Sequence, residues 1–262
     1  MPYSILILPQ LLPAVALILF RVAGLMIAAP LFGASSIPER FRVLLALAVT
    51  FVLLPLVGPT VPADLTLADA VGGVVGEVLI GLLIGVGMNI VLFGAQLAGL
   101  AIGQQGGLGL AQVFDPTGDV ESTTLGEIAF LTATAVFLIV GGHRHLMAAM
   151  LDTFTVIPPL GFRVGEPMLG LLIDLAESSM ILALRISGPV MIAVSMAELA
   201  MAMVSRTVPQ LNILSIGFPL RSLITFGVAG FALYFAGDVI LDAITEGLDA
   251  IRAALELPPA RW

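Results

Sequence analysis

The sequence predicts an all-α, polytopic membrane-associated protein with long broken helices and helical hairpins. Hydrophobic residues make up 59% of the 262 residues, charged residues make up 11%, and the mean hydropathy is +1.14. A soluble domain carries charge on about a quarter of its residues. Several apolar runs reach the about 20 residues that a helix needs to cross a bilayer, and Pro and Gly interrupt them. No polar linker divides the chain, so we expect one membrane domain over residues 1–262.

The composition argues against several kinds of function. The chain has no Cys, hence no thiolate metal site and no Cys nucleophile. All its basic residues are Arg, so the Lys of a Walker A loop is missing. The net charge of −8 does not suit nucleic-acid binding. His143 and His145 stand two residues apart and would not share a helix face. We therefore expect no metal, no cofactor and no enzyme.

The expected helices follow the apolar runs. They cover residues 13–29, 38–54, 66–102, 124–140, 142–156, 167–204 and 222–235. Residues 1–12 carry no positive charge, so we expect no cleavable signal peptide. A helix over 66–102 would be roughly 55 Å long, against a hydrocarbon core of about 30 Å, so it must either break or project from the bilayer. Its small-residue spacing allows close helix contact; the glycines concerned are Gly72, Gly76, Gly81 and Gly85.

An amphipathic tail helix is expected at residues 236–262. Its apolar stripe consists of Ile240, Ile244, Leu248, Ile251 and Leu255, and its polar stripe consists of Asp238, Asp242, Asp249, Arg252 and Glu256. An acidic face is a poor ligand for anionic lipid, so we expect solvent or a protein partner there.

Ionisable residues lie inside the apolar runs: Arg21, Glu77, Arg185 and Glu198, with Asp174 and Glu177 nearby. A charge at the centre of a membrane helix costs about 2.5–3.5 kcal/mol on insertion scales, so these groups should face protein or water. For Arg21, a structural ion pair and a functional role are both open. For Glu77 we favour a satisfied polar contact in a packed interface.

The Gly-rich stretch, residues 103–116 (GQQGGLGLAQVFDP), lies between two apolar runs. Its glycines allow positive φ, yet its apolar residues do not suit a surface loop. Irregular backbone at membrane depth persists only where protein or a water-filled cavity satisfies it. We interpret the stretch as a loop that helps to close a central passage; a mobile turn between two helices is the alternative.

A second irregular stretch, residues 206–221, should break the chain between two helices. Pro209, Gly217 and Pro219 interrupt the helix, and Gln210 and Asn212 can satisfy freed backbone groups. With six spans assumed, four Arg flank each side of the membrane, so the positive-inside rule chooses no orientation; they are Arg40, Arg42, Arg206 and Arg221 against Arg144, Arg163, Arg252 and Arg261.

The chain resembles the FliR family of flagellar type III secretion across nearly its whole length. The motifs that carry the resemblance occur in the same order. They are Arg21, Ala29-Pro30, residues 38–42 (PERFR), 76–81 (GEVLIG), the Gly-rich stretch ending in Asp115-Pro116, 141–143 (GGH) through Asp152 and Pro158, 209–213 (PQLNI) and 217–220 (GFPL).

The resemblance implies a non-enzymatic core subunit of the type III export gate in the bacterial inner membrane, at the flagellar basal body. Such a subunit assembles with FliP- and FliQ-like subunits around a secretion pore for unfolded flagellar proteins, contacts membrane lipid, and faces an FlhB-like switch protein with its tail. The family's loop acts as a pore plug. By position the plug residues here are Gln105, Gly106, Gly107, Leu108, Leu110, Val113, Phe114 and Asp115.

One departure from the family pattern concerns the seal. Family members often carry aromatic residues where this chain has Leu110 and Val113. Only the aromatic residue Phe114 is left, which implies a looser seal or more reliance on partner residues. Flagellar and injectisome systems share these motifs; we favour the flagellar one.

Two other classes of function are alternatives to an export gate. A self-contained secondary transporter could use Glu77, Arg185 and Glu198 as a polar site, and broken helices suit transporters, but no internal repeat is visible. An intramembrane enzyme lacks support, since the chain contains no Gly-x-Ser-x-Gly elbow and no His/Glu metal motif.

Overall fold

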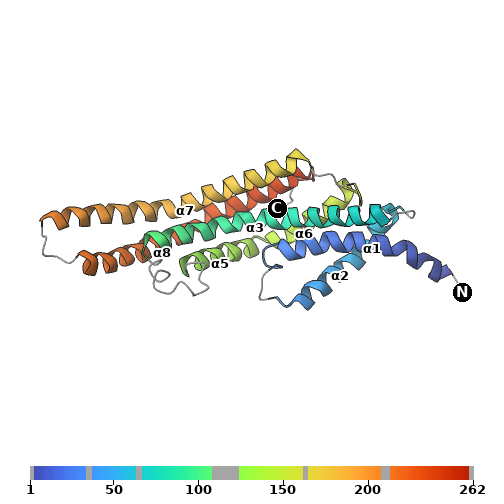
Figure 1. Ribbon diagram of the computed structural model, residues 1–262, viewed down its shortest axis with the longest axis horizontal. Coiled ribbons are helices and arrows are strands. Elements are labelled where there is room, and N and C mark those ends of the chain that lie inside the picture. The colour runs from blue at the N-terminus through green and yellow to red at the C-terminus, as the bar shows by residue number, and fades with distance from the viewer. Residues whose placement is uncertain are drawn as a thin grey trace. The chain divides into compact units, whose positions relative to one another are not determined.

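The computed structural model describes residues 3–33, 37–62, 67–107, 124–161, 165–207 and 213–259; for 3–11, 67–70, 166 and 213–215 it describes the backbone alone. Every regular element in these ranges is a helix (Figure 1). The helices are α1 (Tyr3–Ala28), α2 (Glu39–Val57), the short 3-10 helix η1 (Gly58–Thr60), α3 (Leu67–Gln105), α5 (Thr124–Ile139), α6 (Gly142–Val156), α7 (Glu166–Thr207) and α8 (Ile213–Ala254). The predicted all-α class is confirmed.

Four helices are longer than the sequence predicted. Helix α1 begins at Tyr3 rather than at residue 13. Helix α3 runs for 39 residues without a break, and α7 continues through Pro189 for 42 residues. Helix α8 also has 42 residues; it contains Gly217 and Pro219 and extends to Ala254. The expected break over 206–221 is therefore too long, and the expected separate tail helix is the C-terminal part of α8. Membrane helices tolerate Pro because neighbouring groups satisfy the freed carbonyl.

A true break lies between α5 and α6, which are bent by 65°. Gly141 precedes α6 with φ +77, a conformation that suits Gly because it lacks a Cβ. Gly141-Gly142 was the predicted end of this apolar run, and the structure confirms it.

Membrane-spanning length is reached by four helices among the described residues, or five if the bent α5–α6 pair counts as one span. The four helices are α2 with η1, α3, α7 and α8. Helix α1 has 26 residues; the part with described side chains, Leu12–Ala28, is apolar. The six spans assumed for the charge tally stay a prediction, because this count covers the described residues and α1 continues to Tyr3.

The chain divides into two compact units. The first unit contains residues 1–90, 141–175 and 245–262, and the second contains 91–140 and 176–244. Three of the boundaries fall inside α3, α7 and α8 rather than in linkers. The expectation of a single functional domain stays a prediction.

In the first unit, α1 and α3 pack with their backbones in close contact. A Cβ added to Gly81 would collide with the carbonyl oxygen of Arg21, and one added to Gly24 would lie 2.5 Å from the carbonyl oxygen of Val78. Gly85 approaches the backbone of Ala28 and Ala29 in the same way. The predicted close helix contact is confirmed at Gly81 and Gly85. It is wrong at Gly72, which has nothing within 4 Å.

The second unit has its own apolar core. Val190 and Val194 of α7 pack with residues of α3, α5 and α8, namely Ile102, Leu125 and Ala229. Glycines again allow close approach, since Gly94 contacts the backbone of Ser179 in α7.

The C-terminal part of α8 buries one stripe. Ile240, Ile244, Leu248, Ile251 and Leu255 are each at most 3% exposed, as predicted. Asp238, Asp242, Asp249 and Glu256 are exposed. Arg252 was assigned to the polar stripe, but this is wrong: it is 6% exposed and bonded to Asp152.

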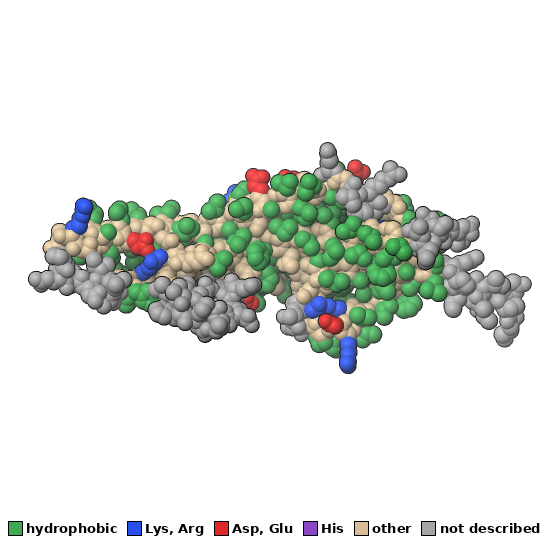
Figure 2. Space-filling view, in the orientation of Figure 1, with side chains coloured by type: hydrophobic (Ala, Val, Ile, Leu, Met, Phe, Trp, Pro, Cys, Tyr) green, Lys and Arg blue, Asp and Glu red, His purple; other side chains and the backbone are tan. Residues whose placement is uncertain are grey.

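Large apolar side chains also cover much of the visible surface (Figure 2). On α7 and α8 they include Ile192, Met196, Leu199, Met203, Phe231 and Tyr234. An apolar surface of this extent is stable against lipid or another protein rather than against water.

Candidate functional site

A buried ion pair lies at the centre of the first unit. Arg21 of α1 donates from Nε to Oε2 of Glu77 in α3, and both side chains are 0% exposed. The glycines next to these residues let the two helices approach closely enough for the side chains to meet.

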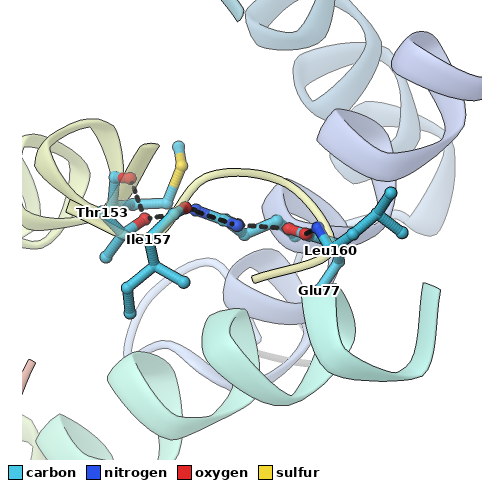
Figure 3. Close-up of polar contacts among 6 residues, drawn as sticks. Glu77, Thr153, Ile157 and Leu160 are labelled. Atoms are coloured by element: carbon cyan, nitrogen blue, oxygen red, sulfur yellow. Dashed lines mark hydrogen bonds and ion pairs between the residues drawn. The ribbon is translucent and has the colours of Figure 1, made fainter. Parts of the chain in front are cut away.

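The rest of the guanidinium and carboxylate is also satisfied (Figure 3). Arg21 Nη1 donates to Thr153 Oγ1 at 3.1 Å, and Nη1 and Nη2 both donate to the carbonyl oxygen of Ile157 at 3.2 Å. The Leu160 backbone N–H donates to Glu77 Oε1 at 3.2 Å. Phe154 stacks on the guanidinium, with Cζ 4.1 Å from the ring centroid.

This network joins α1, α3, α6 and the turn that follows α6. A buried charge is tolerated when it is paired and its remaining hydrogen bonds are made. The network meets that condition, so the structural interpretation of Glu77 is confirmed, and Arg21 faces protein as expected. With every polar atom engaged and no exposure, the pair suits positioning of helices rather than binding of a substrate.

A second polar cluster lies in the second unit, where α3 ends and the Gly-rich stretch begins. Gln105 is the last residue of α3. The N–H of Gly106 donates to the carbonyl of Ile102 at 2.8 Å, and that of Gly107 donates to the carbonyl of Gln104 at 3.1 Å. Gly107 has φ +82. This is the left-handed glycine that ends many helices.

Side chains of α7 and α8 hold this end of α3. Arg221 of α8 donates from Nε to the carbonyl oxygen of Gln105, and its Nη1 lies 3.0 Å from Oε1 of Glu198 in α7. Gln105 Nε2 donates to Ser195 Oγ of α7 at 3.4 Å. A Cβ on Gly106 would lie 2.6–3.0 Å from the side-chain atoms of Thr225.

The predicted plug residues are therefore only partly described. Gln105 belongs to a helix rather than a loop, and Gly106 and Gly107 form a tight turn rather than a flexible segment. The other five, Leu108, Leu110, Val113, Phe114 and Asp115, lie outside the described residues.

The predicted helix-break residues are divided in the same way. Pro209, Gln210 and Asn212 lie outside the described residues. Gly217 and Pro219 lie in the first turns of α8, so the interpretation of these two as part of a break is wrong. A Pro close to the start of a helix removes one backbone bond without ending the helix.

The residues proposed for a transporter site do not form a cluster within either unit. Glu77 belongs to the first unit and is bonded to Arg21. Arg185 and Glu198 are in the second unit, more than three turns apart on α7, roughly 20 Å at 1.5 Å per residue. Glu198 is bonded to Arg221, whereas Arg185 is exposed.

Sequence reasoning missed the contacts of two polar residues, Arg252 and Arg221. Arg252 donates to Asp152 of α6 and, from Nε, to the carbonyl oxygen of Pro258 at 2.6 Å. Arg252 lies four residues after Leu248 and three before Leu255, so helical spacing places it beside the apolar stripe. Arg221 was treated only as a flanking charge, and no local pattern identifies its bond to Gln105. The described residues contain no group of three or more His, Asp or Glu side chains placed to bind a metal.

These features define a multi-pass helical membrane protein whose buried charges position helices. Residues 12–247 match the family model described as bacterial export proteins, family 1. The chain is 32% identical over 218 residues to the flagellar biosynthetic protein FliR of Escherichia coli K12, covering 80% of each chain. It is 28% identical to FliR of Caulobacter vibrioides, over 89% of this chain and 94% of that one. It is 26% identical to the Yop proteins translocation protein T of Yersinia pestis, over 56% of this chain and 58% of that one.

The chain belongs to family 1 of the bacterial export proteins. The resemblance to the FliR family that the motifs indicated is confirmed.

Proposed function

We propose that this chain is a non-enzymatic subunit of a type III protein export apparatus. It forms a secretion pore for unfolded flagellar proteins with FliP- and FliQ-like subunits, in the inner membrane at the flagellar basal body. The observation that carries the proposal is the family match over residues 12–247, together with the FliR relatives that align along most of their length. The flagellar relatives align over 80% and 89% of this chain and the Yersinia translocation protein over 56%, which favours the flagellar system.

The surface of α7 supports a need for partners. Apolar side chains of this helix are exposed, and so are the charged residues Asp174, Glu177 and Arg185. Charges facing lipid near the bilayer centre are costly, so these positions suit a protein partner or a wet lumen. The mixed surface is thus better matched to a multi-subunit assembly than to a lone transporter.

Residues 104–116 act as the pore plug in this proposal. Two properties support it: the apolar residues that follow Gly107 in the sequence can occlude a passage, and the start of the stretch is held by α7 and α8. The acidic face of α8 near Asp238, Asp242 and Asp249 is the proposed contact for the FlhB-like switch protein.

Purification from native membranes tests the proposal. A tagged chain, extracted in mild detergent, should be recovered together with FliP-like and FliQ-like chains. The complex should not be a symmetric homo-oligomer of this chain. Without those partners it should aggregate or be degraded. Recovery as a stable monomer or a symmetric homo-oligomer with no other chain would contradict an export-gate subunit and favour the transporter.

A further inference from the structure

We propose that Arg221 is a positioning residue: it caps the C-terminal end of α3 and thereby sets where the Gly-rich stretch begins. Glu198 orients the guanidinium but is secondary to the cap. The inference rests on the proposed function of residues 104–116 as a plug, and it deepens that function by naming the group that holds the plug's N-terminal end.

The first support is the hydrogen bonding at the end of α3. The last carbonyls of a helix lack partners within it and carry the negative end of the helix dipole. The N–H groups of Gly106 and Gly107 engage the carbonyls of Ile102 and Gln104. Arg221 supplies a charged donor to the carbonyl of Gln105, the last residue of the helix. A charge-assisted bond at this position is of the strong kind.

The second support is the arrangement on α8. Phe218, Arg221 and Thr225 follow one another at intervals of three and four residues, so they share one face of the helix. A Cβ on Gly107 would lie 3.2 Å from the Phe218 ring, and Gly106 lies against Thr225. The same face therefore contacts three successive residues, Gln105, Gly106 and Gly107, and leaves little room for the turn to shift.

The third support is the exposure of the ion pair that Arg221 makes with Glu198. The side chains of Arg221 and Glu198 are 33% and 43% exposed. An ion pair so exposed contributes little because water and salt screen it. Its geometric effect remains: with Nη1 bound to Glu198, Nε points at the carbonyl of Gln105. Loss of Glu198 should thus weaken the orientation, whereas loss of Arg221 should remove the cap.

The test compares ion leak per assembled complex in cells that carry variants of these two residues. Arg221→Met removes every donor at similar length, and we expect a leak several-fold above the unmodified chain. Glu198→Gln retains the cap and should leak far less. Arg221→Lys has one ammonium for two acceptors and should be intermediate. Arg206→Met, an exposed Arg on the same apolar helix α7 as Glu198, controls for loss of a charge.

The exchange of the two residues gives the sharpest result. Glu198→Arg with Arg221→Glu can still form an ion pair between α7 and α8, but a carboxylate cannot donate to the Gln105 carbonyl. We expect this double variant to leak like Arg221→Met. If the exchange restores the seal, or if Arg221→Met and Glu198→Gln leak equally, the cap is wrong and the ion pair alone matters.

A variant with Leu108 to Val113 shortened separates this inference from the proposed function. If the shortened stretch leaks but Arg221→Met and Arg221→Lys do not, the positioning role is overturned and the plug stands. If assembled complexes leak in neither case, the plug itself is overturned, and the positioning role with it.

Discussion

The two ion pairs Arg21–Glu77 and Arg221–Glu198 differ in their surroundings, and the difference predicts different responses to mutation. The first is 0% exposed, and each of its other side-chain nitrogen and oxygen atoms is bonded to Thr153, Ile157 or Leu160. The second is about a third to two-fifths exposed and touches the end of α3. Removal of one partner from a buried, fully bonded pair destabilises the fold, because it leaves an uncompensated buried charge. A partly exposed pair contributes little to stability. Its position beside the Gly-rich stretch is therefore the better guide to its role.

The largest effect is expected for Glu77→Leu, which leaves Arg21 buried without its counter-ion. Breaking one side of a buried pair costs about 3–5 kcal/mol. The amount of folded chain in the membrane and the melting temperature of the purified complex should both fall. Arg21→Met combined with Glu77→Leu removes both charges and should be less harmful than Glu77→Leu alone. A double variant as damaging as the sum of the single ones would contradict this account of the first unit.

Gly81→Ala should have the next largest effect. The new Cβ would collide with the carbonyl oxygen of Arg21, and a backbone atom cannot move aside without separating α1 from α3. Overpacking of this kind costs about 1–3 kcal/mol. Gly72→Ala on the same helix is the matched control: nothing lies within 4 Å, and removal of a helical Gly should stabilise by up to about 1 kcal/mol. Thermal unfolding of the two purified variants should shift in opposite directions; equal shifts would count against close packing at Gly81.

The sequence predicted the kinds of residue involved better than their partners. Arg21 and Glu77 could each be identified from the sequence, because a charged residue inside a membrane segment is costly and usually has a partner or a function. Their pairing spans 56 residues and no local rule predicts it. Arg221 is still harder, since its partner is a backbone carbonyl 116 residues away and any residue type carries one.

Helix boundaries show a related limit. The C-terminal ends of α1, α5 and α6 lie within a residue or so of the predicted ones, because Gly or Pro ends an apolar run there. The same signals misled at Pro55 and Pro219, which lie inside α2 and α8. Pro disfavours a helix by a few kcal/mol, about 3 in an interior position, and the packing of a long apolar helix can exceed that cost.

The smallest effect on stability is expected for Glu198→Gln. An exposed ion pair contributes about 0–1 kcal/mol, so the melting temperature of the complex should hardly change, and still less at high salt. A loss of stability comparable to that of Glu77→Leu would mean that the pair in the second unit is structural like the one in the first.

The distinction between the units is tested most directly by ion leak per assembled complex, measured side by side for Glu77→Leu and for a chain with Leu108 to Val113 shortened. We expect Glu77→Leu to reduce the number of complexes without raising the leak of each. The shortened chain should assemble in normal amounts and leak more per complex. If both changes lower assembly and neither raises the leak per complex, the Gly-rich stretch is a structural turn and its proposed role as a plug is wrong.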